Sequence, residues 1–219
     1  MLLCSVPAAS PRHGSVSGQV TMLDRPASTR RDLATAVIYL EAAGAGAEDR
    51  PDGAPAEAVI AMRGREFIPR MAVVRRGGSV TFPNQDPFSH NVFSNTDPVL
   101  FDLGLYRRGA TRVATFDATG VYPVYCNIHA RMVTYVISVP GRHVTRPDAD
   151  GRFTLADVPV GSYRMQVWHE RAMPSTQELT VTATGTSVRV TLDARGYIAG
   201  GAHLNKFGMP YGSTRSDRY

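Results

Sequence analysis

Lysine is almost absent from this 219-residue chain, and cysteine, tryptophan and long apolar runs are also scarce. The net charge of +5 therefore rests on arginines, with Lys206 as the single lysine. These arginines are scattered and are not interleaved with aromatic residues, which argues against nucleic-acid binding. No stretch is apolar for long enough to cross a bilayer, so the sequence predicts no transmembrane segment. A mildly basic protein is instead expected to attract an acidic protein partner.

Long helical periodicity is missing as well, because 20 glycines and 15 prolines divide the chain into short segments. What remains are short runs rich in β-branched and aromatic residues, such as VTML, AVIYLEA, SVTFPN, TYVISV, YRMQVW and SVRVTL. Runs of this length, bounded by Gly, Pro and Asp, are typical of β-strands. The sequence therefore predicts an all-β fold, and its length suits two small β-sandwiches.

The two cysteines, Cys4 and Cys126, lie in different contexts, although a disulfide between them is one interpretation. Residues 1–13 begin MLLCSVPAAS, which resembles the remnant of an export signal or a clipped lipoprotein signal acylated at Cys4. An ordinary terminal segment is the alternative. We therefore expect an exported protein, either periplasmic or anchored to a membrane as a lipoprotein that faces the periplasm.

Cys126 belongs to a motif with the spacing of metal ligands. The segment VYPVYCNIHARMVTYVISV places Cys126, His129 and Met132 on a short loop between two apolar strands. Upstream, FPNQDPFSHNVFS offers His90 at the end of another strand. A thiolate, two imidazoles and a thioether are the donors of trigonal copper sites with a weak axial sulfur, so we interpret these residues as ligands of one copper ion. Zinc is the main competing metal, but a thioether is a poor fourth ligand for zinc.

Residues 67–139 resemble a cupredoxin, the family of plastocyanin and amicyanin, through REFIPRMAVVRRGGSVTFPNQD, SHNVF and GVYPVYCNIHARM. The short gap between His129 and Met132 is similar to that of amicyanin. The resemblance implies a Greek-key β-sandwich over residues 58–140 that holds one blue, type 1 copper. It also implies that the Asn91 side chain ties the two ligand loops together, and that electrons leave through His129, the partly exposed ligand.

Residues 144–195 resemble the carboxypeptidase regulatory-like domain, a transthyretin-like β-sandwich, through DADGRFTLADVPVGSYRMQVWHE. The first strands of that family are missing there and occur instead at residues 14–43. We therefore predict that the copper domain is inserted into this second domain. The alternative is two consecutive domains, with the N-terminal strands pairing against the cupredoxin sheet. Residues 196–219 are polar and aperiodic, so we expect a flexible tail, or one that orders only against a partner.

These features predict an electron carrier that cycles one copper between Cu(I) and Cu(II), and not an enzyme. Neither a second cluster of paired histidines nor a catalytic His/Asp or carboxylate constellation stands out in the sequence, which argues against a multicopper oxidase or a nitrite reductase. The resemblance implies a redox partner such as a c-type cytochrome or an oxidoreductase. Two other functions fit the same residues: copper binding or delivery without redox turnover, and a non-enzymatic scaffold. The remaining histidines are interpreted as surface or structural residues: His13, His143, His169 and His203.

Overall fold

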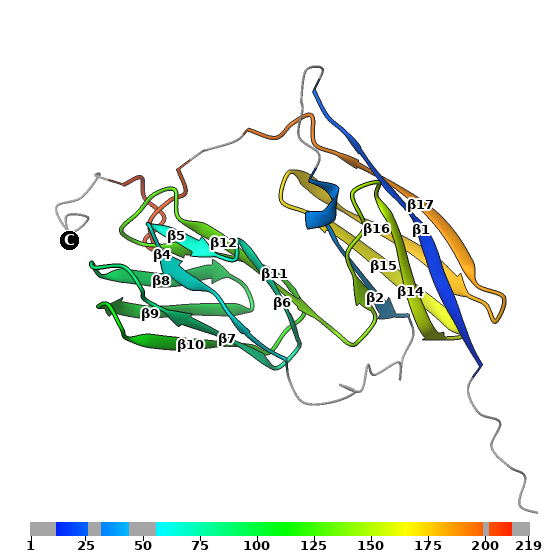
Figure 1. Cartoon of the computed structure of the whole chain (residues 1–219), viewed down its shortest axis with the longest axis horizontal. Helices are drawn as coiled ribbons and strands as arrows, with labels where there is room; N and C mark the ends of the chain where they lie inside the picture. The colour runs from blue at the N-terminus through cyan, green and yellow to red at the C-terminus, as the bar shows by residue number, and fades with distance from the viewer. Residues whose placement is uncertain (1–11, 26–31, 44–55, 199–201, 212–219) are drawn as a thin grey trace, which may run out of the picture. The chain divides into compact units, whose positions relative to one another are not determined.

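The computed structural model is an all-β protein (Figure 1). It describes residues 12–25, 32–43, 56–198 and 202–211. Within these ranges the helical structure is confined to one turn of 3-10 helix, η1 (Leu33–Thr35). No described helix has the length and the apolar character that crossing a membrane requires. Cys4 and most of the predicted signal remnant lie outside the described residues.

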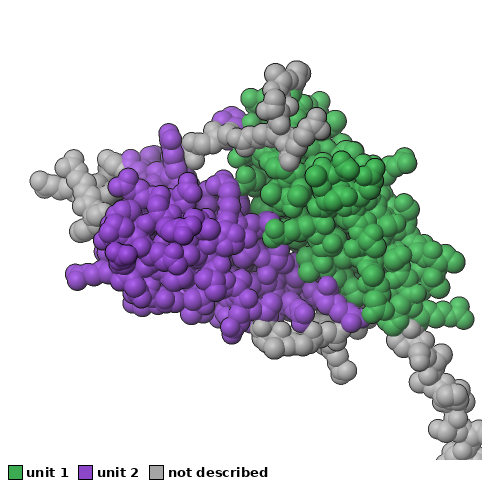
Figure 2. Space-filling model, viewed as in Figure 1, with its two compact units in different colours: residues 1–49, 143–197 green, residues 50–142, 198–219 purple. Residues whose placement is uncertain are grey.

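The chain divides into two compact units, and each unit combines stretches that are far apart in sequence (Figure 2). Unit 1 comprises Met1–Asp49 and His143–Tyr197. Unit 2 comprises Arg50–Arg142 and Ile198–Tyr219, and it contains the predicted metal ligands.

Unit 1 contains a three-stranded sheet of order β14-β1-β17 and a four-stranded sheet of order β13-β2-β15-β16. Both sheets contribute side chains to one hydrophobic core, with Val16 and Val20 from one sheet and Ile38 and Met165 from the other. Each strand can face this core with every second residue. In β17, for example, buried and exposed residues alternate along TSVRVTLD. The strands are β1 (His13–Leu23), β2 (Val37–Ala42), β13 (Val144–Thr145), β14 (Arg152–Pro159), β15 (Gly161–His169), β16 (Ala172–Val181) and β17 (Thr186–Asp193).

The Asp150-Gly151 turn that leads into β14 requires a glycine. Gly151 has a φ of +80°, and a Cβ at this position would lie 2.0 Å from the carbonyl oxygen of Val20. The backbone N–H of Val20 in turn donates to the carbonyl of Gly151 at 2.8 Å. The turn therefore approaches β1 too closely for any side chain, and this approach links the N-terminal strand to the C-terminal half of the chain.

Unit 2 contains a five-stranded sheet of order β6-β12-β11-β8-β9 and a three-stranded sheet of order β10-β7-β3, with β4 and β5 as a separate pair. Its core includes Phe82 from the smaller sheet and Tyr122 and Val136 from the larger one. The strands are β3 (Glu57–Val59), β4 (Ala61–Arg63), β5 (Glu66–Ile68), β6 (Met71–Arg75), β7 (Gly78–Pro83), β8 (His90–Thr96), β9 (Val99–Tyr106), β10 (Thr111–Phe116), β11 (Gly120–Cys126) and β12 (Val133–Val139).

The described part of the C-terminal tail, residues 202–211, differs from the flexible tail that composition predicts. Its backbone and side chains form hydrogen bonds with the rest of unit 2, including one from the backbone N–H of His203 to the Ala130 carbonyl at 3.0 Å. An aperiodic sequence carries no hydrophobic pattern that would reveal such contacts, because they are made by single polar groups at irregular spacing.

Candidate metal centre

Pairing between β8 and β11 brings the predicted ligands to one end of the five-stranded sheet. His90 is the first residue of β8 and Cys126 is the last residue of β11, and Cys126 lies opposite Val92 in the antiparallel register. His129 and Met132 follow in the loop between β11 and β12. Strand pairing therefore brings His90 and His129 close together in space, although they are far apart in the sequence.

The donor atoms of three predicted ligands converge. The Cys126 sulfur lies 3.5 Å from Nδ1 of His90 and 3.5 Å from Nδ1 of His129. These three donor atoms all lie within 4.8 Å of one another, which is close enough for them to share one metal ion. Met132 is buried in the same hydrophobic core as Cys126, and its role as the fourth ligand stays a prediction.

The loop that carries three of the predicted ligands is closed by its own backbone. The N–H of Cys126 donates to the carbonyl of Met132 at 3.1 Å, and the N–H of Met132 donates to the carbonyl of His129 at 2.9 Å. These two hydrogen bonds limit the conformations of the loop. The arrangement therefore reduces the entropy that ordering the ligands would otherwise cost.

Both histidines are suited to metal binding because burial keeps them neutral. His90 is fully buried and His129 is partly exposed. Desolvation lowers the pKa of His90 although the nearby Asp86 opposes the shift. Desolvation also lowers the pKa of His129, since a proton on this ring would be both buried and repelled by a protonated His90. A neutral imidazole keeps a lone pair for the metal, whereas an imidazolium does not.

Burial shifts the pKa of Cys126 in the opposite direction, because the thiol is neutral when it carries its proton. Desolvation raises the pKa of its thiol, and backbone N–H groups of Ile128, Asn91 and His129 partly offset this rise by donating toward the sulfur. Those N–H groups are oriented to stabilise a thiolate. The sulfur is thus expected to lose its proton when a cation supplies the missing positive charge.

Asp86 is a part of the site that the sequence analysis did not identify. Its carboxylate accepts hydrogen bonds from the backbone N–H groups of Gly64 at 2.6 Å and Arg65 at 3.0 Å, and it lies 2.8 Å from Nε2 of His90. Although desolvation acts in the other direction, these hydrogen bonds lower the pKa of Asp86, so the group is ionised. An ionised carboxylate only accepts hydrogen bonds, so Nε2 of His90 carries the hydrogen and Nδ1 faces the metal position.

Asn91 takes a position different from the one that the family resemblance implies. Its side-chain Nδ2 donates to Asp102 at 2.5 Å and does not join the two ligand loops. The loops are joined by backbone instead, because the N–H of Asn127 donates to the carbonyl of Asn91 at 3.0 Å. Asp102 lies on β9, the neighbour of β8 in the sheet, and this placement draws the Asn91 amide toward β9.

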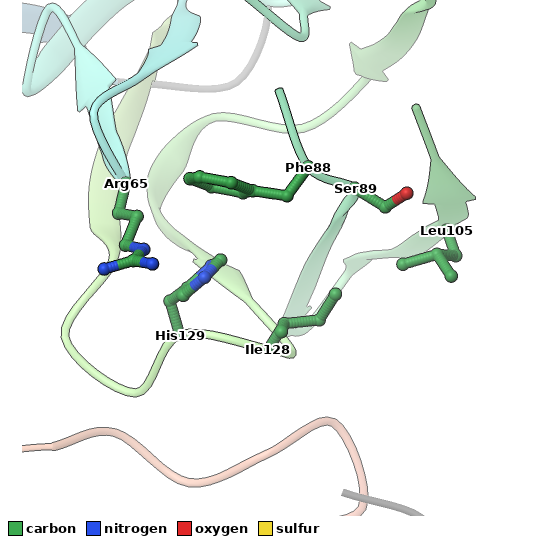
Figure 3. Close-up of a pocket in the computed structure, with 6 residues that line it drawn as sticks. All are labelled: Arg65, Phe88, Ser89, Leu105, Ile128 and His129. Atoms are coloured by element: carbon green, nitrogen blue, oxygen red, sulfur yellow. The ribbon is translucent and has the colours of Figure 1, made fainter. Parts of the chain in front are cut away.

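A pocket of about 500 Å³ opens beside His129 (Figure 3). The His129 ring points toward the Phe88 ring, with 5.6 Å between the ring centroids, and the Arg65 guanidinium lies 5.0 Å from the centroid of Phe88. The lining is mainly apolar, and His129 is the only predicted ligand in it. The full lining comprises Arg65, Phe88, Ser89, Leu105, Ile128 and His129.

Phe88 lies in the short segment PFS that precedes β8, and no sequence motif marks it as part of the site. The sequence shows only that Phe88 lies two positions before a predicted ligand. A phenylalanine at such a position can equally well belong to a hydrophobic core. Leu105 and Arg65 reach the pocket from β9 and from the turn between β4 and β5, which the sequence does not place near His129.

Comparison with known proteins finds no matching family model and no matching curated protein. Several solved structures that resemble part of the chain are copper proteins of the cupredoxin class. A purple cupredoxin from Nitrosopumilus maritimus is 26% identical, covers 37% of this chain and 98% of its own, and has a TM-score of 0.35. An oxidized amicyanin mutant is 21% identical over 37% of this chain and 80% of its own, with a TM-score of 0.35.

A third similar structure belongs to an enzyme. The copper-containing nitrite reductase from Thermus scotoductus is 22% identical, covers 45% of this chain and 25% of its own, and has a TM-score of 0.36. Each of these three likenesses spans less than half of the present chain. These three likenesses lend no support to a transthyretin-like domain, so that resemblance stays a prediction.

Proposed function

We propose that this protein is a mononuclear type 1 copper protein that carries single electrons, with His90, Cys126, His129 and Met132 as its ligands. The observation that supports this most is the convergence of one buried sulfur and two imidazole Nδ1 atoms, with 3.5 Å from the sulfur to each nitrogen. A soft thiolate between two neutral imidazoles is the donor set that trigonal copper sites use.

The donor set favours copper over zinc. Thiolate and imidazole suit both metals, but the buried residue available for the fourth position, Met132, offers a thioether. A thioether is a soft, weak donor that tolerates both Cu(I) and Cu(II). Bound copper would supply the one-electron couple that the polypeptide itself lacks.

The protein's own residues would hold the site in one arrangement during electron transfer. Asp86 fixes the tautomer and the ring orientation of His90, and the hydrogen bonds within the 126–132 loop hold Cys126 relative to Met132. Ligands that are held in this way need little rearrangement when the charge of the metal changes. A small rearrangement favours fast electron transfer.

His129 is the proposed exit for the electron, because it is the predicted ligand that borders the open pocket. The pocket is mainly apolar and carries Arg65 at its side, which suits transient contact with an acidic or apolar protein surface. The proposed partner is a redox protein such as a c-type cytochrome or an oxidoreductase. We further propose an exported location, in line with the sequence of residues 1–13.

The function is tested by loading the metal-free full-length protein with Cu(II) and recording its visible spectrum and its potential. An intense blue band at one copper per chain, with a reversible one-electron wave, is the expected result. Zn(II) and Cu(I) loading of the same sample are the colourless controls. Tight copper binding without a reversible wave would point to a delivery protein, and the absence of binding would leave only the scaffold.

A further inference from the structure

The C-terminal residues 202–211 lie beside the loop that carries three of the proposed ligands (Figure 1). The backbone N–H of His203 donates to the Ala130 carbonyl at 3.0 Å. The Tyr211 hydroxyl donates to the carbonyl of Cys126 at 2.6 Å. Two separate points of the 126–132 loop are therefore held by residues that lie C-terminal to unit 1 in the sequence.

Lys206 connects the same segment to both ligand-bearing parts of the site. Its backbone N–H donates to the side-chain oxygen of Asn127, the residue after Cys126, at 2.9 Å. Its ammonium group donates to Asp102 at 2.6 Å. The other oxygen of Asp102 accepts the amide hydrogen bond of Asn91, which follows His90. One residue thus reaches the neighbours of Cys126 and of His90.

The segment has an internal structure that gives these contacts a fixed spacing. The buried side chain of Asn205 accepts hydrogen bonds from the backbone N–H groups of Phe207 at 2.9 Å and Met209 at 3.0 Å. The His203 ring packs against Tyr125, with 4.4 Å between centroids, and against Tyr211 at 5.3 Å. Residues 202–211 therefore behave as a built element of unit 2.

We propose that residues 202–211 are a clamp that positions the metal-ligand loop, with Tyr211 and Lys206 as its positioning residues. The inference rests on the proposed copper site for its functional meaning, whereas the contacts of the clamp are all between protein groups. By limiting the motion of the 126–132 loop, the clamp slows metal release and shields the sulfur of Cys126. Removal of a single hydrogen bond of this type is expected to accelerate either process roughly two- to tenfold.

The test compares the full-length protein with Tyr211→Phe and Lys206→Met. Tyr211→Phe removes one hydroxyl and keeps the ring, and Lys206→Met removes the ammonium group and keeps the backbone donor. Leu204→Ala is the matched control, because the Leu204 side chain lies in the same segment and is 53% exposed. Hydrogen exchange of the 126–132 amides and alkylation of Cys126 are followed by peptide-resolved mass spectrometry in the metal-free protein, and copper release to a chelator is followed separately.

The clamp predicts faster exchange, faster alkylation and faster copper release in both positioning variants, and no change in the control. Amides of β7 serve as the internal reference, because a variant that unfolds unit 2 as a whole would also lose protection there. Unchanged exchange and alkylation would overturn the clamp. Faster exchange with unchanged copper release would overturn its role at the metal. If the wild-type protein binds no copper, the proposed function fails, while the metal-free measurements still decide whether the clamp holds the loop.

Discussion

The imidazole of His90 lies 2.8 Å from the carboxylate of Asp86, and both side chains are almost fully buried, with 0% and 6% of their surfaces exposed. Two backbone N–H groups from the turn after β4 also donate to that carboxylate. This turn, which the sequence does not connect with metal binding, therefore fixes the orientation of a proposed ligand. A carboxylate that holds the distal nitrogen of a ligand histidine generally raises the affinity of the site.

Asp86→Asn is expected to weaken copper binding by roughly 10- to 100-fold while the protein stays folded. An amide offers one acceptor oxygen, whereas three N–H groups, from Gly64, Arg65 and His90, converge on the native carboxylate. Competition with a chelator of known affinity measures the change. Asp117→Asn, at an exposed position of unit 2, is the matched control, and equal losses in the two variants would contradict this role for Asp86.

Cys126→Ser is expected to abolish the blue absorption, because a hydroxyl does not supply the soft anionic donor that gives rise to this band. Cys4→Ser is the control and should keep both the colour and the copper stoichiometry. The visible spectra of the two copper-loaded variants make the comparison. A blue spectrum in Cys126→Ser would rule out this residue as the thiolate ligand.

Met132→Leu should keep the blue colour and raise the reduction potential. Loss of the axial sulfur removes electron density that favours Cu(II) more than Cu(I), and leucine preserves the volume of this buried position. Voltammetry of the wild type and the variant measures the shift. A lowered potential would show that Met132 does not act as the axial donor.

Unit 1 is expected to lose stability as the pH falls below about 6.5 because of the buried His169. Its Nδ1 accepts a hydrogen bond from the backbone N–H of Arg171 at 3.1 Å, which requires this nitrogen to be unprotonated. Desolvation also lowers the pKa of the ring. The folded state therefore binds fewer protons than the unfolded state, whose histidine has an ordinary pKa. By linkage, the free energy of unfolding rises with pH through this window.

Urea unfolding followed by the fluorescence of Trp168, the single tryptophan, reports on unit 1. We expect a lower free energy of unfolding at about pH 5 than at about pH 7 and a smaller difference in His169→Gln. The ion pairs of Arg171 with Asp24 and Asp32 would remain in that variant. A pH dependence that is the same in both proteins would assign the effect to other groups.

Ile38→Ala should destabilise unit 1 by about 2–5 kcal/mol and leave the copper spectrum unchanged. Ile38 is fully buried and lies opposite Val167 in the pairing of β2 with β15. Val136→Ala, a core position of unit 2, is the matched variant and should spare the Trp168 transition. The nested domain arrangement predicts this separation, whereas loss of the blue colour in Ile38→Ala, with the Trp168 transition retained, would favour consecutive domains.

The all-β class could be predicted from the sequence because strand periodicity is a local property. The alternation in SVTFPN and SVRVTL follows from residues that are two positions apart, and glycine and proline end each run. The grouping of Cys126 with His129 could be predicted for a similar reason, since a short loop keeps its side chains close whatever the rest of the chain does. His90 could be proposed because it lies at the end of another predicted strand, but only the pairing of β8 with β11 places it beside Cys126.

Only the tertiary structure decided which distant groups support these residues. Asp86 contacts His90 directly and is itself held by the backbone N–H groups of Gly64 and Arg65. Tyr211 reaches Cys126 from 85 positions further along the chain. Single hydrogen bonds of this kind leave no periodic trace in a sequence, because their energy depends on where strand pairing places each backbone. Residue types and local spacing thus indicated which residues could bind a metal. The packing of remote segments determined which groups hold these residues in place.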